Sequence, residues 1–281
     1  KCLRTFPYSS EILNLDIFRS EVMISYLEDT SRSSSVSDRQ GKLQKEKDRL
    51  KETLKRYLIL NPSDISSRER LFELEGKGYL SSYIEEINLF SFIEHFKEEV
   101  FNYDTDLIIV LDSDHNIYFE DGGVFLFRQD IIKIQSQKGV ELMNPFFLDF
   151  NPNLTDVYIK TACVLKPDGT HTEGYRSGRR ITFPGLSPGD YIVLGYYCSS
   201  SRAGELKKHF WEHVPLNEAF PIFYKKHVLG YPQIYNLSSN FHNTETMNMK
   251  KSIDALGTDM LKHTLTGMHT EPTKIGRWIP G

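Results

Sequence analysis

Two histidines at helical spacing are the first residues that could bind a metal ion. His209 and His213 are four residues apart, which on a helix would place both imidazoles on one face. The sequence contains neither an HExxH pattern nor an evident third ligand, and the neighbouring Trp211 and Pro215 favour a strand or a turn. We therefore expect no zinc site at this position.

Alternating polar residues form a second candidate metal site. Asp112, Asp114 and Asn116 alternate like the ligands of a calcium loop, but the glycine and the closing glutamate of an EF-hand are missing. We interpret residues 112–116 as a polar hairpin turn. The sequence thus predicts no metal and no cofactor.

Three arginines form a local basic patch. Because guanidinium groups bind carboxylates and phosphates through two parallel hydrogen bonds, Arg176, Arg179 and Arg180 are candidate binding residues. The alternative interpretation is that they are exposed loop charges, which pair with Glu173 and Asp190. Two aromatic residues, Tyr197 and Trp211, are further candidates for contact with a peptide or a glycan.

Two turns must position these residues. Residues 166–169 (Lys-Pro-Asp-Gly) and 184–190 (Pro-Gly-Leu-Ser-Pro-Gly-Asp) combine proline and glycine in the manner of tight corners. A short strand-like run at 180–183 precedes the second turn, and an aromatic run at 191–197 follows it. This pattern predicts a β-meander.

Further strand-like runs surround the meander. Their short length and spacing indicate an antiparallel β-sandwich over residues 104–236, although a barrel has the same signature. The runs cover residues 106–111, 117–120, 124–127, 130–135, 146–150 and 157–165. Most of the numerous aromatic residues would fill the core of such a sandwich.

The N-terminal residues 1–103 have helical periodicity instead. We predict helices over 9–28, 42–60, from Asp64 as N-cap to Gly76, and over 81–100, with a polar loop at 29–41. The order helix, Leu-Asn-Pro, helix, Gly-Tyr, helix resembles one and a half repeats of a tetratricopeptide array. The predicted fold class is therefore α+β, a repeat-like helical region followed by an antiparallel β-sandwich.

A wider pattern carries a family resemblance. A Pro-Asp-Gly turn is followed by Arg-Ile-Thr-Phe-Pro-Gly-Leu-Ser-Pro-Gly-Asp, an aromatic strand, His-Phe-Trp at 209–211 and Phe-Pro-Ile at 220–222. This order resembles the bacterial domain of unknown function 3857, over roughly half of the chain. That family usually precedes a transglutaminase-like domain. The resemblance implies that residues 237–281 are a linker or the start of a truncated transglutaminase-like domain.

Transglutaminase-like catalysis needs a thiolate that a histidine activates and an aspartate that orients the histidine. Cys198, His242 and Asp254 are the set that the resemblance would allow. However, Cys198 precedes a Ser-rich loop and His242 lies in the expected linker, so we predict no catalytic residues in this chain. Cys163 and Cys198 are expected to be buried thiols.

Composition excludes several classes of protein. The chain has 281 residues, of which 39% are hydrophobic and 26% charged, as in soluble globular proteins. A net charge of −4 argues against a nucleic-acid partner, and no apolar run approaches the roughly 20 residues of a transmembrane helix. Because the chain begins with Lys1, we expect its natural start to be missing, and the bacterial periplasm, cell envelope and cytoplasm all stay open as locations.

Two classes of function fit these observations. The first is a non-catalytic scaffold or protein- or peptide-binding module of a bacterial transglutaminase-associated protein, with a protein or peptide as partner. The alternative is the regulatory N-terminal part of a transglutaminase-like or cysteine-protease-like enzyme whose catalytic core lies outside this chain. A carbohydrate-binding sandwich is a third possibility, and the sequence leaves the oligomeric state open.

Overall fold

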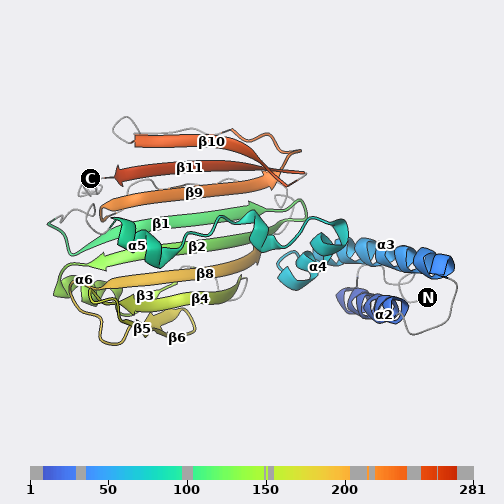
Figure 1. Cartoon of the computed structure of the whole chain (residues 1–281), viewed down its shortest axis with the longest axis horizontal. Coiled ribbons are helices and arrows are strands. Elements are labelled where there is room, and N and C mark those ends of the chain that lie inside the picture. Colours follow the sequence, from blue (N-terminus) through green and yellow to red (C-terminus); the bar gives the residue numbers. More distant parts are fainter. Residues whose placement is uncertain are drawn as a thin grey trace, which may run out of the picture. The chain divides into compact units, whose positions relative to one another are not determined.

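The computed structural model describes residues 9–29, 36–96, 104–148, 150, 155–202, 214, 219–238, 248–257 and 259–270. The chain divides into two compact units (Figure 1). The helical unit comprises Lys1–Tyr83, Phe119–Val124 and Ser199–His209. The sheet unit comprises Ile84–Tyr118, Phe125–Cys198 and Phe210–Gly281.

The helical unit is built on a leucine-rich face of its longest helix. Its helices are α2 (Ser10–Glu28), α3 (Val36–Leu60) and α4 (Ile65–Glu75). Leu50, Leu54 and Leu58 recur at helical spacing on α3 and are buried with Ile24 of α2 and Leu71 of α4. Whether these helices belong to a tetratricopeptide array stays a prediction.

Both ends of α4 follow the signals in the sequence, whereas the start of α3 does not. The carboxylate of Asp64 accepts the Ser67 amide hydrogen at 2.9 Å, which confirms the predicted N-cap of α4. Gly76 has a φ of 70° at the C-cap, where a left-handed conformation suits glycine. Helix α3 begins at Val36 and thus includes part of the predicted loop.

The predicted helix over 81–100 is wrong in its first half. A 3₁₀ helix, η1 (Leu80–Tyr83), ends before it, and α5 (Leu89–Phe96) begins only at Leu89. Between them, the side-chain amide of Gln129 accepts a hydrogen bond from the Ile87 nitrogen (2.8 Å) and donates one to the Ile87 oxygen (2.7 Å). Since these bonds satisfy the backbone of Ile87, the stretch does not need helical hydrogen bonds.

The sheet unit contains two sheets of unequal size. Eight strands follow the order β10-β11-β9-β1-β2-β8-β4-β5, and three follow the order β3-β7-β6. In chain order the elements are β1 (Leu107–Tyr118), β2 (Gly123–Ile134), α6 (Gln137–Met143), β3 (Phe146–Phe147), β4 (Thr155–Leu165), β5 (His171–Glu173), β6 (Tyr175–Ser177), β7 (Arg180–Thr182), β8 (Tyr191–Ser201), β9 (Ile222–Pro232), β10 (Asn248–Leu256) and β11 (Met260–Thr270). The α+β class is confirmed.

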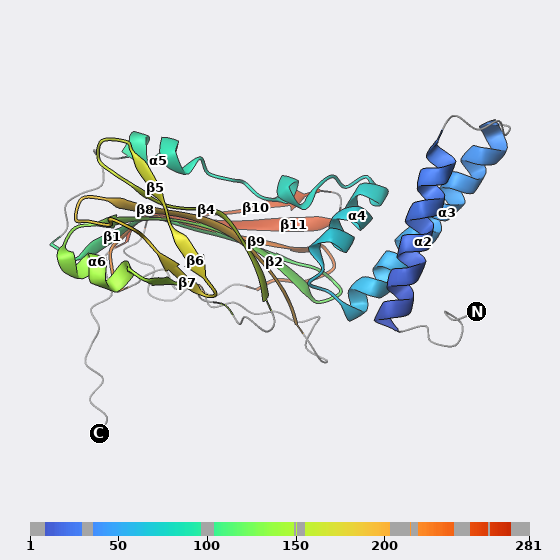
Figure 2. The same cartoon turned by 90° about the horizontal axis from the view of Figure 1, so that it is seen from below.

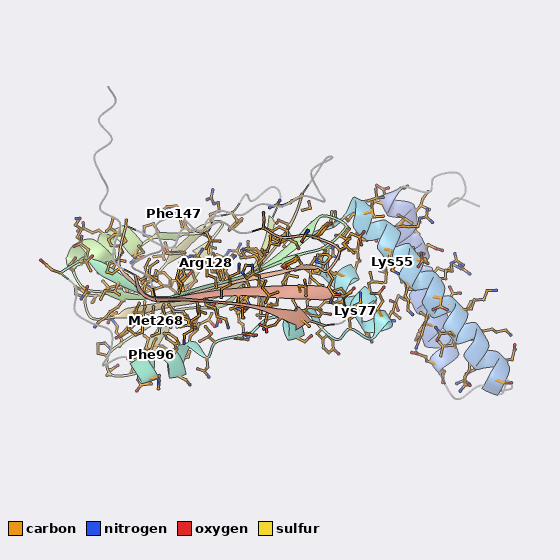
Figure 3. The ribbon with its side chains drawn as sticks, turned by 90° about the horizontal axis from the view of Figure 1, so that it is seen from above. Lys55, Lys77, Phe96, Arg128, Phe147 and Met268 are labelled. Carbon is orange, nitrogen blue, oxygen red and sulfur yellow. The ribbon has the colours of Figure 1, made fainter. Side chains whose placement is uncertain are left out.

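Each face of the large sheet has its own apolar core. One core includes Leu194 of the large sheet with Ile181 and Phe183 beside the small sheet, so the small sheet covers this face. The other core lies under α5, and both Phe96 and Met268 pack against it (Figure 3). Figure 2 accordingly shows α5 on one side of the large sheet and β6 and β7 on the other. The face toward the small sheet is called the inner face below, and the face toward α5 the outer face.

Both predicted turns of the meander are confirmed. The amide of Gly169 donates to the Lys166 oxygen at 2.9 Å and closes the turn between β4 and β5. At the second corner, the Asp190 carboxylate accepts the Ser187 amide hydrogen and a hydrogen bond from the Lys166 ammonium, each at 2.7 Å. Asp190 is buried, so these bonds fix the entry into β8.

The predicted hairpin turn at residues 112–116 is wrong. These residues lie in the middle of β1, a continuous strand of 12 residues. The runs at 124–127 and 130–135 are likewise one strand, β2. In both cases the polar residues that suggested a break have partners on neighbouring strands. The sheet is also not antiparallel throughout, because β1 and β9 are parallel.

Residues beyond 236, where the sequence predicted a linker or a truncated domain, include two strands. β10 and β11 form an antiparallel hairpin, and β11 pairs with β9. They therefore extend the same large sheet to which the strands of the predicted sandwich domain belong.

Candidate functional site

The three candidate arginines contact the protein's own backbone and rings. Arg176 donates from Nε to the Gly178 oxygen (3.0 Å) and from Nη1 to the Val157 oxygen (2.9 Å). Arg179 donates from Nε to the Leu148 oxygen at 3.0 Å. The Arg180 guanidinium lies 5.9 Å from the centre of the exposed Phe147 ring. These contacts join β6 and β7 of the small sheet to neighbouring segments of the same chain.

Tyr197, one of the two aromatic candidates, does not join these arginines. Tyr197 lies on the outer face, because Tyr196 and Cys198 on either side of it belong to the core of the inner face. Its ring stacks on Phe127 at 4.5 Å, and burial raises the pKa of its hydroxyl. Trp211 lies outside the described residues. The predicted set therefore does not form one cluster in the part of the chain that the structure describes.

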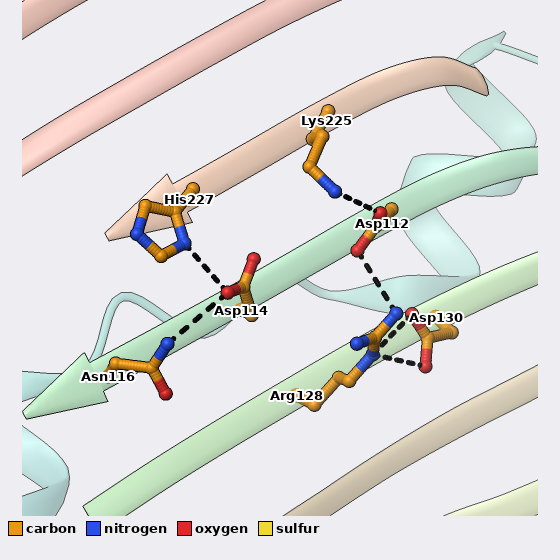
Figure 4. A network of polar contacts seen from close by, with 7 residues as sticks. All are labelled: Asp112, Asp114, Asn116, Arg128, Asp130, Lys225 and His227. Carbon is orange, nitrogen blue, oxygen red and sulfur yellow. Dashed lines mark hydrogen bonds and ion pairs between the residues drawn. The ribbon is translucent and has the colours of Figure 1, made fainter. Parts of the chain in front are cut away.

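A buried ionic network, which the sequence interpretation missed, connects the centre of the large sheet (Figure 4). Its members lie on the inner face of β1, β2 and β9 and are mostly buried. The network, as we use the term, consists of Asp112, Asp114, Asn116, Arg128, Asp130, Lys225 and His227. The signal in the sequence was the spacing of Asp112, Asp114 and Asn116 at every second position, which fits one face of a strand as well as a turn.

Asp112 is the centre of the first half of the network. It lies directly opposite Lys225 in the parallel pair, and the Lys225 ammonium bonds to one oxygen of its carboxylate. The Arg128 guanidinium contacts the other oxygen at 3.3 Å. Through Nε, Arg128 also bonds to Asp130 at 2.9 Å. Two cations and two carboxylates therefore alternate across three strands.

Asp114 is the centre of the second half. It lies opposite His227, whose Nδ1 is 2.7 Å from one carboxylate oxygen, and the Asn116 amide donates to the same oxygen at 3.4 Å. Burial alone would raise the pKa of Asp114, but the hydrogen bond from His227 and the nearby cations bring it below its ordinary value. The carboxylate of Asp114 is thus kept ionised inside the sheet.

Burial has the largest effect on the pKa of Asp130, on the neighbouring strand β2. It raises the pKa of Asp130 to about 6, even though the charge of Arg128 acts in the opposite direction. The negative charge of Asp130 is in turn the main reason that the pKa of Arg128 lies well above its ordinary value. A buried set of this kind fixes the register of strands more than it adds stability, because both charges lose their hydration.

The outer face of β1 carries two buried polar side chains with no hydrogen-bond partner among the described residues, Ser113 and His115. His115 is 1% exposed, and its ring lies edge-on to Phe127. Burial, followed by the charge of Lys226, lowers the pKa of His115 to about 4. The imidazole is therefore neutral near pH 7.

Neither described cysteine can serve as a nucleophile in its present environment. Cys163 and Cys198 are free and buried, as expected, and burial raises the pKa of each thiol to about 11. Of the set Cys198, His242 and Asp254, His242 lies outside the described residues. The other two are on β8 and β10, which are five strand spacings apart, or about 24 Å. That set cannot act as one catalytic triad.

The large sheet ends on β10 at one edge and on the three-residue strand β5 at the other, so β10 is the longer of its two edge strands. β10 pairs with β11 on one side and has no strand on its other side among the described residues. Along β10, residues 250–255 are all exposed, and Ile253 is 57% exposed. Met249, Lys251, Ile253 and Ala255 share the inner face with β11 residues such as His263, while Lys250, Ser252 and Asp254 share the outer face.

The network and this edge belong to one continuous set of strands. Lys225 and His227 fix β9 against β1, β11 pairs with β9 over ten residue pairs, and β10 pairs with β11 over nine. An edge strand held in this way presents its backbone groups in fixed positions. The arrangement can bind an extended peptide through main-chain hydrogen bonds.

The part of the chain that the structure describes contains no group of three or more His, Cys, Asp or Glu side chains that could hold a metal ion. None of the helices among the described residues has both the length and the apolar character that crossing a membrane demands.

Comparison with known proteins shows a distant structural likeness. No family model matches the sequence, and no curated protein matches it. The chain is similar to a crystal structure described as that of a "putative protease" from Parabacteroides distasonis, at 11% identity and a TM-score of 0.46. The match covers 61% of this chain and 37% of that one, so this chain spans well under half of that protein. A likeness of this strength carries no argument about fold or activity.

Proposed function

We propose that this chain is a non-catalytic module that binds an extended peptide segment of a partner protein at the β10 edge. The main observation in support is that β10 has an unpaired, exposed edge nine residues long within the described sheet. Addition of a strand to such an edge is a recurring mode of peptide recognition. About half of the residues of an edge strand direct both backbone hydrogen-bonding groups away from their neighbour.

The side chains of β10 support a peptide of alternating character. On the inner face, the exposed Ile253 lies between Lys251 and Ala255 and offers an apolar contact beside the edge. On the outer face the strand is polar. A bound segment would therefore place apolar side chains on the inner face and polar ones on the outer face.

The environment of the thiols supports a non-catalytic role. Because Cys163 and Cys198 have pKa values raised to about 11, they are protonated at neutral pH and lack the thiolate that a transglutaminase-like or cysteine-protease-like mechanism needs. Association with such an enzyme, in a bacterial protein, remains part of this proposal and rests on the sequence resemblance.

Selection from a random library tests the proposal directly. Twelve-residue peptides displayed on phage would be selected against the full chain, and the best binder synthesised for amide hydrogen-exchange measurements. We expect the bound peptide to protect backbone amides of β10. Ile253→Asp should weaken binding at least tenfold, because it places a charge beside the apolar side chains of the peptide.

A matched control is Tyr175→Asp, which changes an equally exposed residue of β6 in the small sheet. It should change the affinity less than twofold. Protection of amides away from β10, together with equal binding by the two variants, would contradict the proposed site.

A further inference from the structure

We propose that β10 also pairs with β10 of a second copy of this chain, forming an antiparallel two-fold dimer with Ser252 on the axis. This inference rests on the proposed function, because it gives the same open edge a second occupant. The dimer would keep the edge covered until a peptide displaces one copy. The argument depends on the register of β10 and on the charges that flank the edge.

Symmetry restricts the possible registers. In an antiparallel pair, directly opposite residues lie on the same face of the sheet. A two-fold axis perpendicular to a continuous sheet maps each face onto itself, so a residue can be opposite only one that is an even number of positions away. The axis must therefore pass between two copies of the same residue.

The charges of β10 favour one of these registers. With Ser252 on the axis, Lys250 lies opposite Asp254 of the second copy, and this pair occurs twice. Moving the axis to Lys251 would place that lysine opposite its own copy. Moving it to Ile253 would place Lys250 opposite Leu256 and leave the charges unmatched. Opposite charges at directly opposite positions stabilise a strand pair, and like charges destabilise it.

Charges in the neighbouring strand continue the same pattern. Asp254 lies directly opposite Lys262 of β11, and Lys262 bonds to Glu85, which also accepts a hydrogen bond from Lys226 at 2.7 Å. The charges of Glu85, Lys262 and Asp254 therefore alternate in sign along one row, and Lys250 of the second copy would add the next positive charge. In a single copy, the row ends at the sheet edge on the exposed carboxylate of Asp254, whose hydrogen-bond donor there is Ser252, at 2.9 Å.

The inner face is compatible with this register. Lys251 lies opposite Ile253 of the second copy, so its aliphatic stem can cover the exposed isoleucine. A nine-residue edge is only about 30 Å long, and stable interfaces bury roughly 800 Å² per partner. We therefore expect a weak dimer that forms at concentrations on the order of 100 µM.

Disulfide cross-linking tests the register. In the full chain with Cys2→Ser, Ser252→Cys would place two thiols opposite each other on the axis, within the distance range of a disulfide. We expect mild oxidation to cross-link Ser252→Cys at least tenfold faster than Lys251→Cys or Ile253→Cys. Faster cross-linking of either control, or equal rates for all three, would overturn the register.

Sedimentation velocity of the unmodified chain, between about 5 and 500 µM, tests the dimer itself. We expect concentration-dependent dimerisation, which Asp254→Lys should weaken at least tenfold by placing lysines opposite each other. A monomer at all concentrations would overturn the inference. Peptide binding distinguishes a failure of the dimer from a failure of the proposed function. If the chain is a monomer and a selected peptide protects the β10 amides, the proposed function holds and the dimer is wrong. If the chain is a dimer that no peptide dissociates, the dimer holds and the proposed function is wrong.

Discussion

Replacing His115 with leucine should remove much of the acid sensitivity of the sheet unit. The imidazole is buried, and the pKa of about 4 in the folded chain compares with about 6.5 in an unfolded chain. As the pH falls below 6.5, the unfolded chain therefore binds a proton that the folded chain does not yet accept. Stability is present above pH 6.5 and is lost as the pH falls toward 4.

The size of the effect follows from these two pKa values. The proton linkage of His115 should lower the free energy of unfolding by about 2.5 kcal/mol between pH 7 and pH 4.5. Leucine has a similar volume and no proton to bind, so this loss should be absent from His115→Leu. At pH 7 the substitution should be nearly neutral or stabilising, because it also removes two ring nitrogens without hydrogen-bond partners in the described structure.

Urea unfolding followed by circular dichroism, at pH 7 and at pH 4.5, provides the measurement. The quantity to compare is the change in unfolding free energy between the two pH values, in the parent chain and in the variant. Other groups titrate in this range, including Asp130, whose raised pKa makes the fold less stable as the pH rises from about 4 to 6. They are common to both proteins and cancel in the comparison.

The control is His171→Leu, at an exposed position on β5. It should keep the pH dependence of the parent chain. If His115→Leu loses as much stability as the parent at pH 4.5, the imidazole is not held neutral by burial, and the reasoning about the outer face of β1 is refuted.

Three further predictions concern stability at other positions. Asp112→Ala should cost about 3–5 kcal/mol in urea unfolding at pH 7, because it removes the carboxylate that pairs with the buried Lys225 and leaves Arg128 with Asp130, whereas Asp38→Ala, at an exposed ion pair, should cost less than about 1 kcal/mol. Equal losses would show that the buried network has no special role. Gly139→Ala should lower the melting temperature, because a Cβ there would lie 2.2 Å from the Asp106 backbone oxygen. The control Gly41→Ala, in open space within α3, should stabilise the protein by about 0.5–1 kcal/mol. An unchanged melting temperature for Gly139→Ala would contradict the close packing at that glycine. Asp130→Asn should flatten the part of the pH–stability curve between about pH 4 and 6, where the ionising carboxylate destabilises the parent, and a curve parallel to that of the parent would exclude Asp130 as the titrating group.

Local signals in the sequence were reliable where the structure is made by local contacts. The cap at Asp64, the leucine face of α3 and the two glycine-containing turns depend on residues within a few positions of one another, and all are present. The sequence also correctly gave buried thiols at Cys163 and Cys198.

Failures occurred where distant partners change the meaning of polar residues. Asp112 and Asp114 suggest a turn when read along the chain, but residues 113 positions later satisfy both within the sheet. In the same way, Gln129 bonds to the backbone of Ile87, which is not helical although its neighbours have helical periodicity. A hydrophobic periodicity of 2 or 3.6 residues contains no information about partners that are distant in the sequence.

The candidate site was only partly predictable for the same reason. A peptide-binding role was inferred from the sequence, but the edge strand itself lies in a stretch interpreted as a linker or the start of a truncated domain. Six consecutive exposed residues at 250–255 give little hydrophobic signal, because an edge strand with two solvent-facing sides need not alternate.

The parallel pairing of β1 and β9 has a consequence for synthesis of the chain on the ribosome. β2 can pair with β1 as soon as the hairpin is complete, but the opposite side of β1 has to wait for about 100 more residues to be translated. Until then, Asp112 and Asp114 lack the lysine and histidine that compensate them in the finished sheet. A nascent chain stalled before β9 would therefore expose one side of a twelve-residue strand on which Asp112 has only Arg128 of β2 as a cation and Asp114 lacks its histidine. The charge of these carboxylates discourages premature pairing with other chains.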